Sequence, residues 1–160
     1  MPSTAERLVE DVEARDDRVL RFMRLIWSID HELERVSKRM ESSLGLTVAQ
    51  RMTLLLIGRH AGISGGGLAA LMHVHPGTMS GILKRLEAGG FIARTGHEDD
   101  ARRRLLTLTP RGTAANRQQR GTLESTVRGL LRSHSSQEVA ATERVLGALA
   151  ARLRDTAGDE

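Results

Sequence analysis

The sequence predicts a mainly α-helical chain with one small β-hairpin, an α+β fold. Apolar residues recur with the helical period of about 3.6 over most of the 160 residues. Near residue 100 the period changes to 2 in two short runs, which is typical of paired strands. A chain of this length can bury one sizeable core and carry helical extensions. We therefore expect a single domain over residues 1–160.

The first predicted element is a long helix over residues 17–45, where apolar residues recur at helical spacing until a glycine ends the pattern. Thr47 is a good N-cap for the next helix. That helix contains Leu54–Ile57, a run that is apolar on all sides, as expected for a buried helix.

Two short helices joined by a tight turn are predicted next. Ser64 can cap the first helix, and the turn is His73-Val74-His75. Pro76 suits the first position of the second helix, where a missing N–H costs nothing. A pair of glycines at 89–90 ends this helix, so the segment reads as a helix-turn-helix.

A β-hairpin follows directly. Strands are expected over residues 91–96 and 104–109, bridged by the charged loop HEDDARR. A hairpin behind a helix-turn-helix makes a wing, so residues 46–112 are predicted to form a winged helix-turn-helix lobe.

Long helices are expected at both ends of the chain. One helical region should run from Pro110 to about Arg132, and a last helix from about Ser136 to Arg154. The apolar faces over residues 17–45 and 113–155 are too extensive for one small lobe to cover. We interpret them as dimerisation helices of a homodimer.

The charge distribution favours a polyanionic partner. Lys and Arg against Asp and Glu number 8 against 10 in residues 1–46, 13 against 5 in residues 47–134, and 3 against 5 in residues 135–160. A basic middle between acidic ends is the pattern expected when the middle faces a nucleic acid.

The composition excludes several classes of protein. There is no cysteine, which excludes disulfides, thiolate metal sites and a cysteine redox switch, and fits a reducing cytoplasm. The apolar runs are far shorter than the roughly 20 residues that span a bilayer. The N-terminus is acidic where a signal peptide would be basic and then apolar, so we expect a cytoplasmic protein without a membrane partner.

The second helix of the helix-turn-helix has the residues that base reading requires. Small, hydrogen-bonding residues on the first outer turn let a backbone approach base edges in the major groove. The residues that meet this demand are Gly77, Thr78, Ser80 and Gly81. Lys84 and Arg85 can reach phosphates. An ordinary surface helix is the alternative, but two early glycines would then only weaken it.

The wing carries a second set of candidate DNA contacts. Asp100 can orient the guanidinium of Arg102, leaving a rigid arginine to enter the narrow minor groove. Arg103 and Arg104 would add phosphate contacts. Behind Ser64, three successive glycines leave only backbone N–H groups to face a phosphate.

The His-x-His pair leaves an alternative open. His73 and His75 straddle a turn without a nearby acidic residue, so metal ligation is less well supported than capping or phosphate contact by His75. A metal-responsive regulator or a metal-dependent hydrolase using this pair remains the main rival. A winged helix used only for protein contact is the second rival. Because no nucleophile elbow, phosphate loop or paired-carboxylate motif occurs, we expect no enzyme, no cofactor and no metal.

The order of the predicted elements, the size of the chain and its motifs together resemble the MarR family of winged-helix transcription regulators. The resemblance lies in GLTVAQ, in GGGLAALMHVHPGTMSGILKRLEAGGFIART and in DDARRRLLTLTPRG. It departs from the family pattern in the glycines 65–67 and in Ala101, where a second arginine is common.

The resemblance implies a homodimeric, sequence-specific regulator of double-stranded DNA, most often a repressor, acting on a near-palindromic operator. It also implies a small aromatic or lipophilic effector bound between the terminal helices and the lobe. Trp27, His31 and Met52 are candidate lining for that effector, or else simply core.

Overall fold

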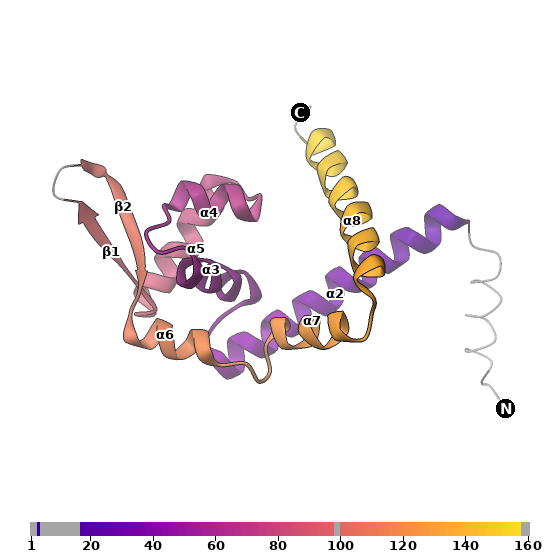
Figure 1. Ribbon diagram of the computed structural model, residues 1–160, viewed down its shortest axis with the longest axis horizontal. Coiled ribbons are helices and arrows are strands. Elements are labelled where there is room, and N and C mark those ends of the chain that lie inside the picture. The colour runs from indigo at the N-terminus through magenta and orange to yellow at the C-terminus, as the bar shows by residue number, and fades with distance from the viewer. Residues whose placement is uncertain (1–2, 4–16, 98–99, 158–160) are drawn as a thin grey trace. The chain divides into compact units, whose positions relative to one another are not determined.

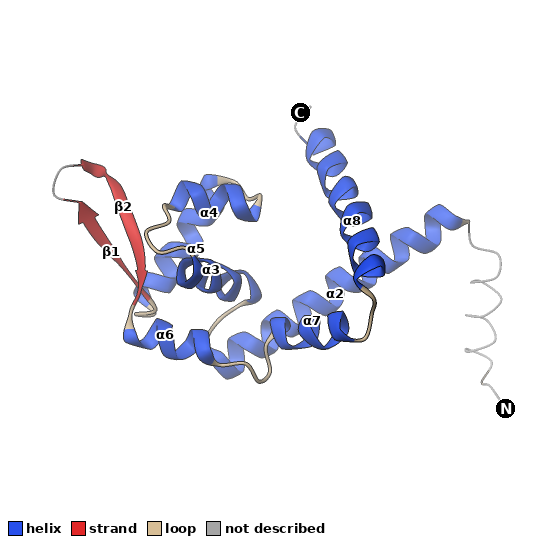
Figure 2. Cartoon of the chain, viewed as in Figure 1, coloured by secondary structure: helices blue, strands red, loops and turns tan. Residues whose placement is uncertain are grey.

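The computed structural model describes residues 3, 17–97 and 100–157 of the chain, and it confirms a mainly helical fold with one small two-stranded sheet (Figures 1 and 2). Two compact units are present, Met1–Arg117 and Gln118–Glu160. The first unit contains α2 (Arg18–Leu44), α3 (Val48–Arg59), α4 (Gly65–Met72), α5 (Pro76–Ala88), β1 (Ile92–His97), β2 (Asp100–Leu108) and α6 (Pro110–Arg117). The second contains α7 (Leu123–Arg132) and α8 (Ser136–Ala157).

The boundary between α2 and α3 follows the local signals in the sequence. Gly45 adopts a left-handed conformation with φ 70° and closes α2, its N–H donating to the carbonyl of Glu41. Thr47 and Gln50 form a capping box, in which each side chain accepts a hydrogen bond from the other's backbone N–H. Both predictions, the glycine stop and the Thr47 cap, are confirmed.

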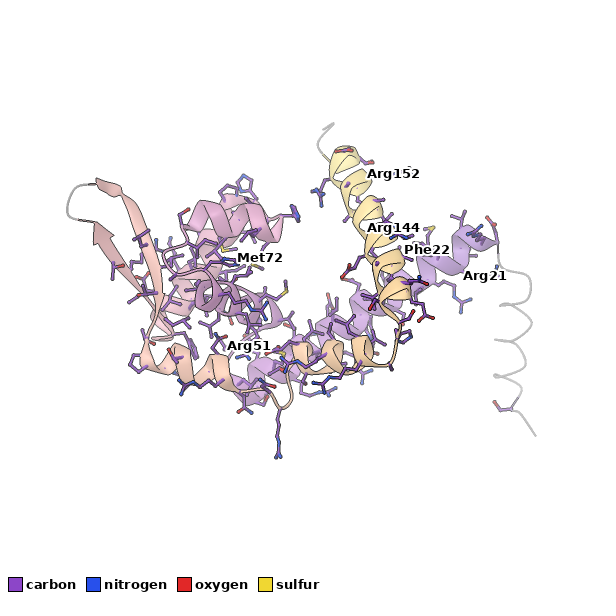
Figure 3. All side chains as sticks on the ribbon, viewed as in Figure 1. Arg21, Phe22, Arg51, Met72, Arg144 and Arg152 are labelled. Atoms are coloured by element: carbon purple, nitrogen blue, oxygen red, sulfur yellow. The ribbon has the colours of Figure 1, made fainter. Side chains whose placement is uncertain are left out.

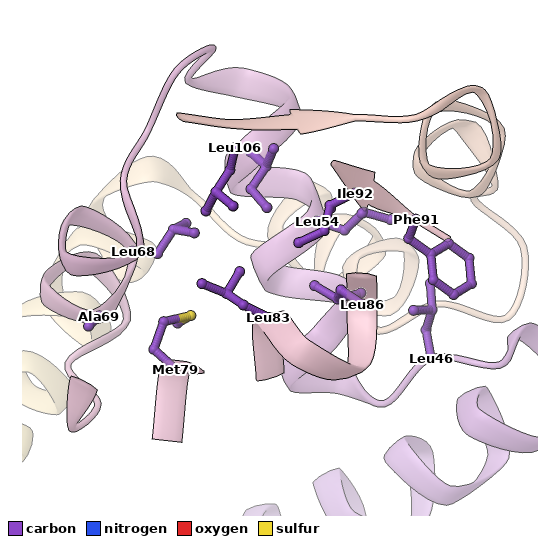
Figure 4. Packing of buried hydrophobic residues seen from close by; sticks show 11 residues of the cluster. Leu46, Leu54, Leu68, Ala69, Met79, Leu83, Leu86, Phe91, Ile92 and Leu106 are labelled. Atoms are coloured by element: carbon purple, nitrogen blue, oxygen red, sulfur yellow. The ribbon is translucent and has the colours of Figure 1, made fainter. Parts of the chain in front are cut away.

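The core of the first unit lies where α3, α4, α5 and the hairpin meet (Figure 4). Burying each of its leucine, isoleucine, methionine and phenylalanine side chains contributes about 1.5–3 kcal/mol, so this cluster holds the short helices in place. Its members are Leu46, Leu54, Ile57, Leu68, Ala69, Met79, Leu83, Leu86, Phe91, Ile92 and Leu106.

The hairpin is longer on its second strand than the sequence predicted. Ile92 pairs with Leu108 and Gly96 with Arg104 in an antiparallel register, and after a register shift His97 pairs with Asp100. The loop expected over 97–103 was therefore wrong for His97, which ends β1, and for Asp100–Arg103, which belong to β2. Backbone pairing needs no apolar side chain, so a strand can run through the arginines without apolar alternation. Glu98 and Asp99 of the expected loop lie outside the described residues.

The single helical region expected from Pro110 to about Arg132 was also wrong. It is two helices, α6 and α7, separated by a segment in which Gly121 has φ 73°. A left-handed residue cannot continue a right-handed helix. Thr122 then occupies the N-cap position of α7, and its hydroxyl donates to the carbonyl of Gln119 at 2.8 Å. The Gly-Thr pair is a recognisable stop and start signal within a stretch almost free of apolar residues.

No helix within the described ranges is long and apolar enough to cross a membrane.

Candidate DNA-binding interface

A tight left-handed turn joins α4 to α5. His73 ends α4 with φ 51°, and its N–H donates to the carbonyls of Ala69 and Ala70. At the other end of α4 the hydroxyl of Ser64 accepts a hydrogen bond from the N–H of Gly67 at 3.1 Å. Ser64 thus caps α4, as predicted, and the two short helices are held at a fixed angle by turn and core.

His75 is the N-cap of α5. Its Nδ1 accepts a hydrogen bond from the backbone N–H of Gly77 at 3.1 Å, so Nδ1 is the unprotonated nitrogen in this geometry. The predicted capping role is confirmed. Within the described ranges no group of three or more His, Asp or Glu side chains could hold a metal ion.

The outer face of α5 carries the residues that were expected to read DNA. Thr78, Ser80, Lys84 and Arg85 are exposed, whereas the opposite face is buried in the core through Met79, Leu83 and Leu86. That the exposed side chains contact DNA stays a prediction, as it does for Ser64, His75 and Gly77.

Gly77 and Gly81 on this face differ in the space that surrounds them. A Cβ on Gly77 would lie 3.1 Å from Nδ1 of His75, so the cap itself disfavours a larger residue there. A Cβ on Gly81 would meet nothing within 4 Å and its φ is not positive, so no contact inside the described chain requires glycine. Glycine in a helix interior costs about 1 kcal/mol relative to alanine.

For Asp100 and the arginines of the wing, the structure describes only the backbone. Asp100, Arg102, Arg103 and Arg104 lie on β2, but their side chains lie outside the described part of the structure. Orientation of Arg102 by Asp100 and the contacts of all four residues with DNA stay predictions.

Arg94 on β1 is a residue that the sequence reasoning missed. Its Nε donates to Oε2 of Glu87, at the end of α5, at 3.1 Å, and this side chain is 27% exposed. Arg94 also borders a hollow of about 190 Å³ that is otherwise lined by Gly65, Gly66, Pro76, Met79, Ser80 and Leu83. A positive charge thus lies beside the starts of α4 and α5. The signal available in the sequence was the arginine among the uncharged residues Ile92, Ala93 and Thr95.

The three candidate effector residues are not core. Trp27 is 75% exposed and Met52 45% exposed, and His31 on α2 is exposed as well. The core alternative was therefore wrong, because the face of α2 that carries Trp27 and His31 lacks a covering element in the described chain. A role in effector binding stays a prediction.

The second unit has an apolar groove of its own. It has a volume of about 340 Å³ and is lined by side chains of α7, α8 and the turn between them: Val127, Leu130, Leu131, His134, Glu138, Val139, Thr142 and Glu143. Leu130 at its edge is 58% exposed, an unfavourable state for a leucine unless another surface covers it.

The sequence is similar to known transcriptional regulators over part of its length. Residues 44–103 match the sequence model described as MarR family. The organic hydroperoxide resistance transcriptional regulator of Bacillus subtilis is 30% identical over 88 residues, which are 55% of this chain and 60% of that protein. The HTH-type transcriptional repressor Rv2887 of Mycobacterium tuberculosis is 36% identical over 73 residues, 46% of this chain and 52% of that protein. The matches thus span little more than half the length of these curated relatives.

A solved structure agrees over most of the chain. The crystal structure of MepR of S. aureus in complex with DNA superposes with a TM-score of 0.69 at 22% identity, covering 82% of this chain and 97% of that chain. This likeness shows the winged-helix fold. With the sequence match across the helix-turn-helix and the first part of the wing, the chain is a winged-helix protein whose residues 44–103 are similar to the MarR family.

Proposed function

We propose that the protein is a sequence-specific, double-stranded DNA-binding transcription repressor that acts as a homodimer on a near-palindromic operator. The observation that carries this proposal is the outer face of α5. There Thr78, Ser80, Lys84 and Arg85 are exposed around a glycine that internal packing does not require. A helix that lies in the major groove needs small, hydrogen-bonding residues at this place.

Gly81 is the residue of this face that packing within the described chain does not explain. Alanine at this position would fit the described chain and would favour the helix by about 1 kcal/mol. Glycine at such a position is explained when a surface outside the chain approaches the backbone closely. A base edge or a sugar-phosphate backbone in a groove is such a surface.

The relatives support the same function. The B. subtilis relative is named a transcriptional regulator, and the M. tuberculosis relative is named a transcriptional repressor. Each match is longer than residues 1–43 and longer than residues 104–160. Each therefore overlaps residues 44–103, the range that the family sequence model covers. We propose no catalytic role for the chain.

A second copy of the chain is the proposed cover for the exposed apolar faces. On α2 large apolar side chains remain exposed from Val19 at 62% to Leu33 at 37%, and Leu153 on α8 is 58% exposed. Soluble chains rarely leave apolar surface of this extent open to water. Two copies that cover these faces mutually would also present two α5 helices to a palindromic site.

A ligand-responsive repressor is the finer form of the proposal. The resemblance to the family suggests a small aromatic or lipophilic effector, with Trp27, His31 and Met52 as candidate contacts. None of the three is buried in the core of the described chain.

Selection from a random duplex library tests the proposal directly. The purified protein should enrich a near-palindromic sequence whose half-sites lie about one helical turn apart, roughly 10 bp centre to centre. Enrichment of no sequence would count against it. Stoichiometric zinc in protein purified without a histidine tag would instead favour the metal-dependent rival.

A further inference from the structure

Arg51, on α3, is the largest fully buried side chain of the described residues. Only 2% of the residue is exposed, although its guanidinium is charged. Figure 3 labels this side chain among the others of the chain. A buried charge is strongly destabilising unless hydrogen bonds and opposite partial charges compensate it. What the guanidinium binds therefore explains why an arginine occurs here.

The guanidinium binds the carboxyl end of α6. Nη1 donates to the carbonyl oxygen of Ala115, and Nη2 donates to the carbonyl oxygen of Asn116 at 3.3 Å. Carbonyls in the last turn of an α-helix have no intrahelical donor and carry a partial negative charge. Arg51 thus closes α6 from an element 64 residues earlier in the chain.

The amino end of α6 is fixed as well. Thr109 accepts a hydrogen bond from the N–H of Gly112 at 3.0 Å and donates its hydroxyl proton to the carbonyl of Gly90 at 2.6 Å. A Cβ on Gly112 would overlap the carbonyl oxygen of Phe91, so the two backbones lie in direct contact. α6 is therefore held at both ends against the core of the first unit.

The last turn of α6 lies closely against α3. A Cβ on Gly58 would collide with the side-chain amide of Asn116, and Oδ1 of Asn116 is buried without a hydrogen-bond partner in the described chain. An unpaired buried carbonyl oxygen is unfavourable. The two bonds from Arg51 to the same turn offset that cost and keep the turn in place.

The position of α6 in the chain gives these contacts a consequence. α6 ends at Arg117, and the second compact unit begins at Gln118. The Arg51 contacts therefore hold the last turn of α6, which is the point at which the chain leaves the first unit.

We propose that Arg51 is a positioning residue: by binding the last carbonyls of α6 it fixes the exit of the chain from the winged-helix unit, and so sets the half-site spacing that a dimer accepts. This inference rests on the proposed function, since it requires a dimer that binds two half-sites. A residue that merely stabilised the lobe would weaken binding to one half-site and to two half-sites alike.

The test uses the full chain and duplexes built from the selected operator. One duplex carries a single half-site, and a series carries two half-sites with the spacer lengthened or shortened by about one or two base pairs, each of which rotates one half-site by roughly 35°. Arg51→Met removes the hydrogen bonds to both carbonyls of α6. Arg51→Lys keeps the positive charge but lacks the planar guanidinium whose two nitrogens donate to the two carbonyls. Asn116→Ala is the matched control, because it changes the same turn and leaves the backbone carbonyls that Arg51 binds.

Wild-type protein should bind the optimal two-site duplex at least about 100-fold more tightly than the single half-site. In Arg51→Met that ratio should fall by about tenfold, and affinity should depend less strongly on spacer length. The affinity of this variant for a single half-site should stay within about threefold of wild type. Arg51→Lys should give an affinity ratio between those of wild type and Arg51→Met. Asn116→Ala should bind most tightly at the same spacer length as wild type.

A sharp optimum retained in Arg51→Met would overturn the inference, as would an equal loss on one and two half-sites. If Arg51→Met does not fold, a wild-type spacing profile in Arg51→Lys would overturn it instead. Failure of the wild-type chain to bind any duplex would be a failure of the proposed function, which is a different result.

Discussion

Gly81 and Gly112 belong to the same unit and are glycine for opposite reasons. At Gly112 a side chain would overlap the carbonyl oxygen of Phe91, whereas at Gly81 it would meet open space. The fold requires the first glycine, whereas no contact in the described chain requires the second. This contrast makes the pair informative about function.

Gly81→Ala should change stability and DNA affinity in opposite directions. The helix gains about 1 kcal/mol of stability. A methyl group facing the groove should cost about 1–3 kcal/mol of operator affinity if bases are read there. Thermal unfolding and a duplex binding assay on the same preparation measure both effects. Gly112→Ala is the contrasting variant and should lower the unfolding temperature. Operator affinity at or above wild type in Gly81→Ala would remove the main support for α5 as the reading helix.

His75 allows its capping role to be separated from a DNA contact. Asparagine caps a helix as well as any residue, so His75→Asn should keep the unfolding temperature, whereas His75→Ala should lose about 1 kcal/mol. If the imidazole also donates a hydrogen bond to a phosphate, both variants should weaken DNA binding equally. Binding by His75→Asn that equals wild type would limit the residue to capping.

Residues whose partners lie close in the sequence could be predicted from it. Thr47, Ser64 and His75 cap helices through N–H groups two or three residues further on, and each cap was foreseen. Arg51 could not be foreseen, because its partners lie 64 and 65 residues away and only the packing of α6 on α3 brings them together.

At the scale of elements, order and type were predictable, and lengths were less so. Periodicity identified the helices and the hairpin. It missed the break at Gly121, because a polar stretch carries little periodic signal, and it started β2 too late in the chain, because arginines pair through their backbone without apolar alternation. Such errors concern backbone geometry that hydrophobic patterns do not encode.

The start of α8 is predicted to depend on pH. The side-chain hydroxyl and the backbone N–H of Ser135 donate to the carboxylate of Glu138, at 2.7 and 2.8 Å, and hold the pKa of Glu138 below its ordinary value of 4.5. A lowered pKa means that these bonds stabilise α8 fully above pH 4.5 and are lost as the pH falls through the lowered value.

An NMR titration of the Glu138 carboxyl carbon should therefore give a midpoint below 4.5. Ser135→Ala removes the hydroxyl that contributes most and should move the midpoint back toward the ordinary value. A midpoint at or above 4.5 in the wild-type chain would show that the capping bonds do not form in solution.

At the scale of the whole molecule, the exposed apolar faces predict that one copy of the chain is incomplete. Leu130→Asp places a charge at an α7 position that is 58% exposed in a single copy, so the lobe should fold normally. In a dimer the charge would be buried, and the protein should become monomeric in sedimentation. Gly129→Asp is the matched control, one residue earlier and about 100° around the same helix. A dimer that survives Leu130→Asp would place the interface elsewhere.

The claim that α5 reads sequence is tested most directly by a salt titration of affinity for the selected operator and for a scrambled duplex of equal length. At physiological salt wild-type protein should prefer the operator by about 10³-fold or more. Thr78→Ala or Ser80→Ala should cost about 1–3 kcal/mol on the operator and little on the scrambled duplex. Arg102→Ala should weaken both and lower the salt slope by about 0.9 for each phosphate that the variant no longer neutralises. A preference unchanged by the Thr78 and Ser80 substitutions but abolished by Arg102→Ala would contradict α5 as the reading helix.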